Sequence, residues 1–143
     1  MENILVSACL LGVSCRYDGK SKANEAVLTL RERYNLIPVC PEVFGGLPTP
    51  RTPSERVGER VVMKDGTDVT DNYERGAIEA ERLCKIYGIK TAILKERSPS
   101  CGKGEIYDGS FTGTLTARDG VTAELLISEG IRVLGESEIN ILL

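Results

Sequence analysis

The chain has 143 residues, and its 41% hydrophobic and 27% charged residues are an ordinary balance for a globular protein. This length allows one domain with its own core, residues 1–143, and is too short for two. A net charge of −3 gives no general attraction to nucleic acid or to an anionic membrane. We therefore expect no stable nucleic-acid partner and no membrane contact. Because no basic leader follows Met1, we expect a cytoplasmic protein.

The cysteine and histidine content narrows the possible chemistry. The five cysteines occur without a secretion signal, so a disulfide framework is not expected. Free thiols then serve as buried apolar groups, nucleophiles or metal ligands. The chain has no histidine, which excludes Ser-His-Asp and Cys-His catalysis and every metal site that needs imidazole. Any metal must be held by thiolate, carboxylate or backbone groups.

Alternating apolar and amphipathic segments predict strands and helices in turn. Apolar runs predict strands at residues 3–8, 36–39, 89–95 and 131–134. Amphipathic segments predict helices at residues 24–34, 70–87 and 118–129. Asn24 is a suitable N-cap for the first helix, and Gly88 ends the second. Pro38 places a bulge or a sheet edge in the second strand.

Three other segments lie between or after these elements. Residues 40–56 form a loop rich in proline and glycine, and a loop of this length usually lines a site. Residues 59–70 predict a β-hairpin around the turn pair Asp65-Gly66. Residues 104–113 form a second glycine-rich loop, and residues 139–143 are an apolar tail that could dock on the core.

This order of elements predicts an α/β fold. We expect one three-layer domain with a mostly parallel, Rossmann-like sheet, helices on both faces and a small β-hairpin. In such sheets ligands bind beyond the carboxyl ends of the strands. Cys9, Cys40 and Cys101 each follow one of the first three predicted strands. The three thiols should therefore meet at one edge of the sheet.

Cysteines this far apart in sequence do not form a zinc knuckle, which needs close pairs. Three thiolates gathered by a rigid sheet can hold a cubane iron–sulfur cluster and leave one iron without a protein ligand. The alternative is that all three are buried structural residues. Cys15 could complete a four-cysteine site or act as a redox partner, although packing is favoured for it. Cys84 lies on an apolar helix face and is assigned to the core.

Polar residues near these cysteines are candidates for catalysis. Glu42, two residues after Cys40, could serve as a general acid and base, or could merely accept hydrogen bonds from loop amides. Ser98 and Ser100 flank Pro99 and could orient a water molecule or a substrate carbonyl. Neither serine has a histidine to activate it, so we reject a nucleophilic role for both.

Three arginines lie on the loops around the expected site. Arg16, Arg51 and Arg56 could bind an anionic group of a substrate, with solvated surface charge as the alternative for each.

Three motifs carry a resemblance to a known family. They are S-A-C-L-L-G-V-S-C-R-Y-D-G at residues 7–19, C-P-E-V-F-G-G-L-P-T-P-R-T-P-S-E at 40–55 and L-K-E-R-S-P-S-C-G at 94–102. In this order they resemble the thiouracil desulfidase family, formerly a domain of unknown function. The resemblance covers nearly the whole chain.

The resemblance implies a 4Fe-4S cluster held by Cys9, Cys40 and Cys101, with Glu42 and Ser98 as the catalytic residues. It implies a non-redox reaction in which water replaces the sulfur of a thiolated pyrimidine and hydrosulfide leaves. Relatives that act on thiolated transfer RNA carry an extra domain, so a free base or nucleotide is the expected substrate here. Two alternatives stay open: a zinc-thiolate or redox-sensing small-molecule-binding protein, and a binding domain whose cysteines only pack.

Overall fold

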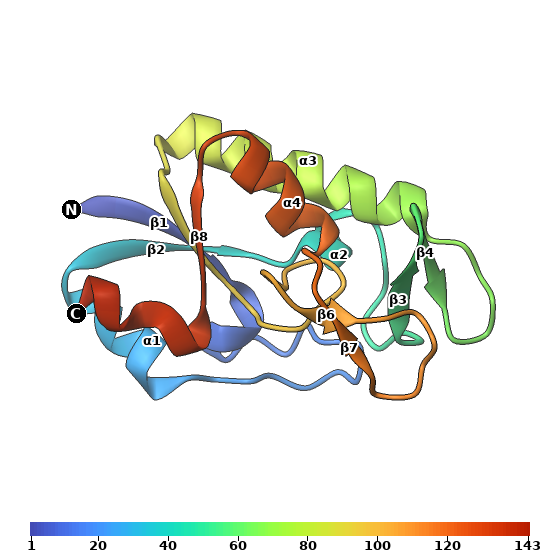
Figure 1. Ribbon diagram of the computed structural model, residues 1–143. Coiled ribbons are helices and arrows are strands. Elements are labelled where there is room, and N and C mark those ends of the chain that lie inside the picture. Colours follow the sequence, from blue (N-terminus) through green and yellow to red (C-terminus); the bar gives the residue numbers. More distant parts are fainter.

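Four parallel strands form the central sheet of the protein (Figure 1). The computed structural model describes residues 1–143. The strands follow the order β2–β1–β5–β8 across the sheet. Their bounds are Glu2–Ser7 for β1, Tyr34–Val39 for β2, Thr91–Leu94 for β5 and Arg132–Gly135 for β8. Leu5 pairs with Ile37 on one side and with Ala92 on the other. The predicted parallel sheet is confirmed, and Pro38 lies in an edge strand.

Helices cover both faces of the sheet, as Figure 1 shows. Successive side chains of a strand point to opposite faces, so Ile4 and Val6 belong to one apolar cluster and Leu5 to another. The Leu5 cluster includes residues of α3 (Thr70–Tyr87) and α4 (Val121–Ser128). The other includes residues of α1 (Glu25–Thr29) and of the 3-10 helices η1 (Ala8–Leu11), η2 (Leu30–Glu32) and η3 (Glu136–Leu142). The expected three-layer α/β architecture is therefore confirmed.

The helix ends agree in part with the sequence signals. The Asn24 side chain caps α1 by accepting a 3.0 Å hydrogen bond from the amide of Val27. This first helix is shorter than predicted, because the chain tightens into η2 after Thr29. Gly88 ends α3 with a left-handed φ of 63°. α4 begins later than predicted, because the residues before it turn back to pair with the loop around residue 102.

The strand before the predicted turn has a partner on each side in the structure. β4 (Arg60–Met63) pairs antiparallel with β3 (Ser54–Val57), which precedes it. The segment after Asp65-Gly66 also pairs with β4. The Met63 amide donates to the Thr67 carbonyl at 2.8 Å, the Val69 amide donates to the Val61 carbonyl at 2.9 Å, and Val62 forms an antiparallel bridge with Asp68. The predicted hairpin around Asp65-Gly66 is therefore present, and β4 pairs in addition with β3, a strand that was not predicted. β3 was missed because its central residues are charged and yet buried, which no alternating pattern indicates.

Short elements occur inside both predicted loops. α2 (Pro41–Phe44) begins directly after Cys40, in the proline-rich loop. β6 (Ile106–Tyr107) and β7 (Leu115–Thr116) form a small antiparallel ribbon around the glycine-rich loop. The apolar tail docks as expected, with two residues of η3 buried against the core.

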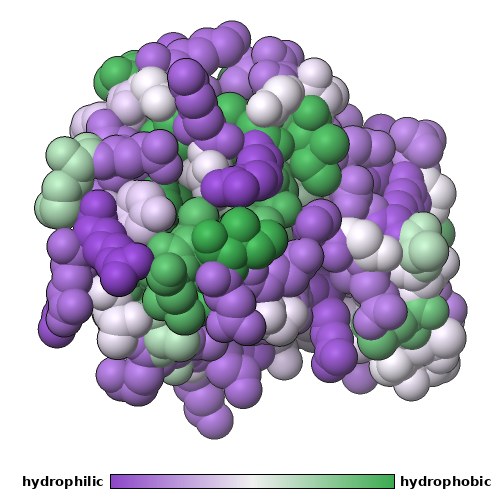
Figure 2. Space-filling model, turned by 60° about the vertical axis from the view of Figure 1, so that its left-hand side comes forward, coloured by the Kyte–Doolittle hydropathy of each residue, from purple (hydrophilic) through white to green (hydrophobic).

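The surface on the side of the molecule that carries both termini is mostly hydrophilic, and apolar side chains gather near the middle of the view (Figure 2). The core beneath the surface is dense, and Ile4, Leu5 and Val6 of β1 are completely buried. None of the helices combines the length and the apolar character needed to cross a membrane.

Candidate metal centre and active site

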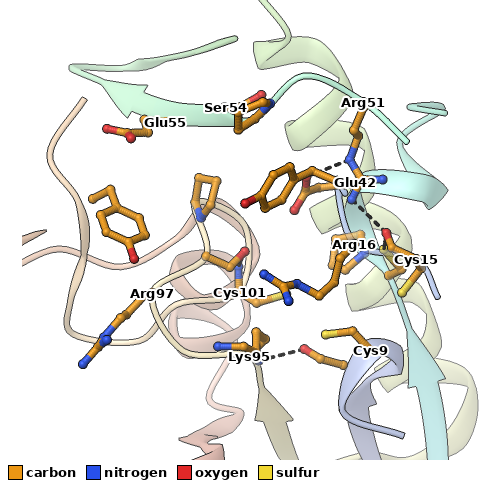
Figure 3. A pocket seen from close by; sticks show the side chains of 18 of the residues that line it. Cys9, Cys15, Arg16, Glu42, Arg51, Ser54, Glu55, Lys95, Arg97 and Cys101 are labelled. Atoms are coloured by element: carbon orange, nitrogen blue, oxygen red, sulfur yellow. Dashed lines mark hydrogen bonds and ion pairs between the residues drawn. The ribbon is translucent and has the colours of Figure 1, made fainter. Parts of the chain in front are cut away.

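Cys9, Cys40 and Cys101 lie beyond the ends of three adjacent strands. Cys9 is in η1 after β1, Cys40 directly follows β2, and Cys101 lies in the turn after β5. All three line one cavity of about 650 Å³ (Figure 3). Because the strands are parallel, their carboxyl ends meet at one edge of the sheet, which is the usual ligand position in this architecture.

A serine hydroxyl and a close glycine position Cys101. The Ser98 hydroxyl oxygen accepts hydrogen bonds from the amides of Ser100 and Cys101, both at 3.1 Å. The Ser98 carbonyl also accepts from the Gly102 amide at 2.8 Å. Gly120 presses on this turn, since a Cβ there would lie 2.6 Å from the Ser100 carbonyl carbon. The Cys101 sulfur is therefore held on a rigid turn.

The turn that holds Cys40 is fixed by the start of α2. Pro41 occupies the first helical turn, where its missing amide hydrogen is not needed. The Cys40 carbonyl accepts a 2.9 Å hydrogen bond from Phe44. The Cys40 sulfur lies 3.7 Å from the Cys15 carbonyl oxygen, which brings the loop after η1 against the end of β2.

The thiols lie within electrostatic range of one another. A hydrogen bond from the Cys15 thiol lowers the pKa of Cys40 to about 7, against the effect of burial. Burial and then the charge of Cys40 raise the pKa of Cys9 to about 11, against the nearby Lys95 and Arg16 cations. Burial raises the pKa of Cys101 to about 12. Ligation by a metal would favour the thiolate form of each residue.

The donor set fits an iron–sulfur cluster better than a single ion. No three cysteine or carboxylate side chains are gathered closely enough to hold one metal ion. The ligands of one zinc ion must touch one another, whereas the thiolates of a cubane bind separate irons and stand further apart. Cys9, Cys40 and Cys101 line one cavity, as separate ligands of a single cluster would. Cys15 is buried next to Cys40 and also lines the cavity, and its thiol donates to the Cys40 sulfur.

Glu42 lies in the first turn of α2 and its side chain reaches the same cavity. Its Oε1 atom accepts a hydrogen bond from Arg51 Nε at 3.1 Å and another from the Tyr73 hydroxyl at 2.8 Å. Figure 3 shows Glu42 and Arg51, with a dashed line between their side chains. The hydrogen-bond donors to this carboxylate are side chains. The alternative considered from the sequence, in which loop amides donate to Glu42, is not what the structure shows.

The other candidate residues from the sequence lie in different positions. Ser98 lines the cavity, whereas Ser100 is fully buried and its hydroxyl pairs with that of Thr122 at 3.1 Å. The Arg16 side chain points into the cavity, with a 3.9 Å ion pair to Asp18 and a cation–π contact 5.7 Å from the centre of the Tyr17 ring. Ser100 is therefore not placed to contact a ligand in this cavity, and Arg16 is.

The other two arginines that were expected to bind an anionic group of a substrate, Arg51 and Arg56, form their hydrogen bonds with protein groups. The Arg51 guanidinium donates to Glu42, to the Pro48 and Cys15 carbonyls and to the Thr49 hydroxyl. Arg56 is buried and reaches the N-terminus of α4, where its Nη1 donates to the Asp119 carbonyl at 2.8 Å.

Several residues of the cavity were not singled out in the sequence. Tyr107 and Phe111 form an aromatic wall, and their segment is held by Glu55, whose Oε1 accepts from the Phe111 amide at 3.1 Å. Lys95 forms a 3.0 Å ion pair with Glu136 beside the cavity. The aromatic residues follow the Cys101 motif in a glycine-rich loop, which is the one sequence signal that could have indicated them. Nothing in the sequence pattern indicated Lys95.

The profile of the 2-thiouracil desulfurase family matches residues 4–138. The chain belongs to this family. It is 42% identical to the uncharacterized protein YbbK of Bacillus subtilis (strain 168), over 96% of this chain and 97% of that protein. Its structure is similar to that of the 4Fe-4S-dependent thiouracil desulfidase TudS, with a TM-score of 0.94 and 49% identity. That match covers 99% of this chain and 95% of TudS. The family predicted from the three motifs is confirmed.

Proposed function

We propose that this chain is a thiouracil desulfidase that depends on a 4Fe-4S cluster. It would convert the thiocarbonyl of a thiolated pyrimidine into a carbonyl. The observation that carries the proposal is one cavity shared by Cys9, Cys40, Cys101 and Glu42. Membership of the 2-thiouracil desulfurase family and the similarity to TudS support it.

The reaction needs no external electron donor or acceptor. The oxygen of water replaces the sulfur, and sulfur departs as hydrosulfide with one proton released. The cluster, held by Cys9, Cys40 and Cys101, would supply a Lewis-acidic iron with affinity for sulfur. The protein has to orient the pyrimidine, direct the water and move its protons.

Glu42 is suited to proton transfer by the arrangement of its two oxygens. Both protein donors bind Oε1. The only buried side-chain nitrogen or oxygen without a partner is Arg56 Nε, so the unpartnered Glu42 Oε2 is accessible to solvent. This oxygen can take a proton from the attacking water and return it to the product. Ser98, whose oxygen already accepts two amides, has its hydroxyl proton free to donate to water or substrate.

The cavity walls suit a flat, polar ring. Tyr107 and Phe111 line the cavity and can pack against a pyrimidine face. Arg16 extends a cation into the cavity, where it can bind an anionic or carbonyl oxygen. These features accept either free thiouracil or its nucleotide as the substrate.

The direct test uses protein purified without oxygen. Iron and acid-labile sulfide per chain are measured first, and 2-thiouracil and 4-thiouracil are then added without any reductant. We expect about four irons per chain, and uracil and sulfide released in equal amounts. Protein that holds the cluster and releases no sulfide from either compound or its nucleotide would overturn the proposal.

A further inference from the structure

The Glu42 carboxylate is held by one of its oxygens only. Arg51 Nε and the Tyr73 hydroxyl both donate to Oε1, at 3.1 and 2.8 Å. Two donors from different directions stop the carboxylate from rotating, because rotation would break both hydrogen bonds. Oε2 has no protein partner and is accessible to solvent. The two oxygens are therefore distinguished by their environment.

Tyr73 is well placed to be a fixed donor. It lies on α3 with 1% of its surface exposed, in a cluster with Leu47, Val61 and Val69. Burial and then the negative charge of Glu42 raise its pKa well above the usual value. The phenol therefore keeps its proton and always donates. Since the ring cannot move within this cluster, the direction of the donated hydrogen bond is set by the core.

Arg51 is anchored just as firmly by a separate set of contacts. Its side chain is 3% exposed. Besides Glu42, it donates to the Pro48 carbonyl at 3.2 Å and to the Cys15 carbonyl at 3.0 Å. Its own amide donates to the Tyr17 carbonyl at 2.8 Å. With every bond directed at the protein, the guanidinium has an orienting role, which differs from the substrate-binding role expected from sequence.

We propose that Tyr73 and Arg51 are positioning residues that fix Glu42 by Oε1 so that Oε2 faces the reacting water. This inference rests on the proposed function, because it assigns a role to Glu42 in that reaction. Neither residue needs to touch the substrate. Their effect on the rate passes through the Glu42 carboxylate, since a small displacement of a catalytic group lowers a rate strongly.

The first experiment compares Tyr73→Phe with Tyr34→Phe, both loaded with the cluster. Tyr73→Phe keeps the ring and removes the hydroxyl that donates to Glu42. Tyr34, the first residue of β2, is the matched control. Its hydroxyl donates a 3.4 Å hydrogen bond to the Leu142 carbonyl and makes no hydrogen bond with Glu42. For Tyr73→Phe we expect kcat to fall by about tenfold to a hundredfold, with KM, iron content and absorption spectrum unchanged. Tyr34→Phe should keep the wild-type kcat.

Arg51→Lys tests the second donor with the positive charge retained. A lysine cannot reproduce the planar set of donors that binds Glu42 and the two carbonyls. We expect a fall in kcat at least as large as for Tyr73→Phe, when the rate is expressed per bound cluster. A wild-type rate per cluster in either variant would overturn the proposal for that residue.

A double-mutant cycle separates positioning from a general structural effect. In the Glu42→Gln background, where proton transfer is already lost, adding Tyr73→Phe should leave the residual rate unchanged. If the fold-loss in rate of the double variant equals the product of the losses of the two single variants, Tyr73 acts independently of Glu42 and the proposal is overturned. So would a loss of iron that accounts for the whole loss of rate in Tyr73→Phe.

A crystal structure of Tyr73→Phe tests the inference without any activity. We expect the Glu42 carboxylate to have turned or to occupy more than one orientation, and an unchanged carboxylate would overturn the inference. If wild-type protein releases no sulfide, the proposed function fails, while this structural result still decides whether Tyr73 orients Glu42.

Discussion

Gly76 of α3 lies directly against the carbonyl of Pro41. A Cβ at Gly76 would stand 1.9 Å from the Pro41 carbonyl oxygen, far inside contact distance. Gly45, at the other end of α2, is equally close to the Asn72 carbonyl, at 2.0 Å. Two glycines therefore allow α2 to pack against α3, and α2 carries Glu42 and begins directly after Cys40.

Replacing Gly76 with alanine should displace this turn. Backbone cannot yield as a flexible side chain does, so Gly76→Ala must move α2 away from α3. We expect lower cluster occupancy and a loss of stability of about 1–3 kcal/mol, measured by iron content and by denaturant unfolding. Glu74→Ala, at an exposed position of the same helix, is the control. Full iron content in Gly76→Ala would show that Cys40 does not depend on this contact.

Substitution of the three proposed cluster ligands should lower the iron content, whereas substitution of Cys84 in the core should not. We expect Cys9→Ser, Cys40→Ser and Cys101→Ser each to lose iron and activity. Cys84→Ser should keep both and lose about 1 kcal/mol of stability, because Cys84 lies on the buried face of α3 in the apolar cluster that contains Leu5. Iron analysis of all four variants is the measurement. Equal iron loss in Cys84→Ser would contradict the assignment.

Glu42→Gln should separate proton transfer from cluster binding. The amide keeps the shape of the side chain but cannot exchange protons at Oε2. We expect turnover to fall by about 10²–10⁴-fold, with the absorption spectrum of the cluster unchanged and still perturbed by added thiouracil. If the variant instead loses iron and thermal stability together, Glu42 braces the turn after Cys40 and has no catalytic role.

Cys15→Ala should show that Cys15 is not a ligand. Its thiol is buried and donates to Cys40, so the change removes a packing group and one hydrogen bond. We expect iron content close to that of the wild type, with stability lower by about 1 kcal/mol. Iron loss as complete as in Cys40→Ser would make Cys15 part of the metal centre.

The reactivity of the thiols in cluster-free protein should depend on pH in a fixed order. The thiolate is the nucleophile, so alkylation accelerates as the pH rises through the pKa of each thiol. That pKa is about 7 for Cys40, about 11 for Cys9 and about 12 for Cys101. Iodoacetamide at pH 8 should therefore modify Cys40 first, as peptide mass spectrometry can show. Cys15→Ala should move the Cys40 profile to higher pH, and prior modification of Cys101 would contradict the order.

Much of the fold could be predicted from local signals. Apolar runs mark strands, and Gly88 marks the end of α3 at the predicted residue. The order of strands and helices then requires a parallel sheet, which places the residues after β1, β2 and β5 at one edge. The shared cavity of Cys9, Cys40 and Cys101 follows from that rule. The three motifs also indicated the family, and the match to the family profile confirms it.

The errors have a common physical cause. β3 was missed because Glu55 and Arg56, which are charged, are buried by partners distant in sequence. A strand pattern records the polarity of a side chain and not the partner that compensates its charge. For the same reason the pairing of β4 with β3 was not predicted, although the turn at Asp65-Gly66 was.

The sequence alone determined the succession of strands and helices along the chain, the edge at which the cysteines meet and the family. These depend on local patterns and on the handedness of parallel connections, which hold for any chain. Only the tertiary structure decided how the site is held together. Tyr73 lies 31 residues from Glu42, and Arg51 lies 36 from the Cys15 carbonyl. Such contacts form only when separate segments pack, so no local pattern specifies them.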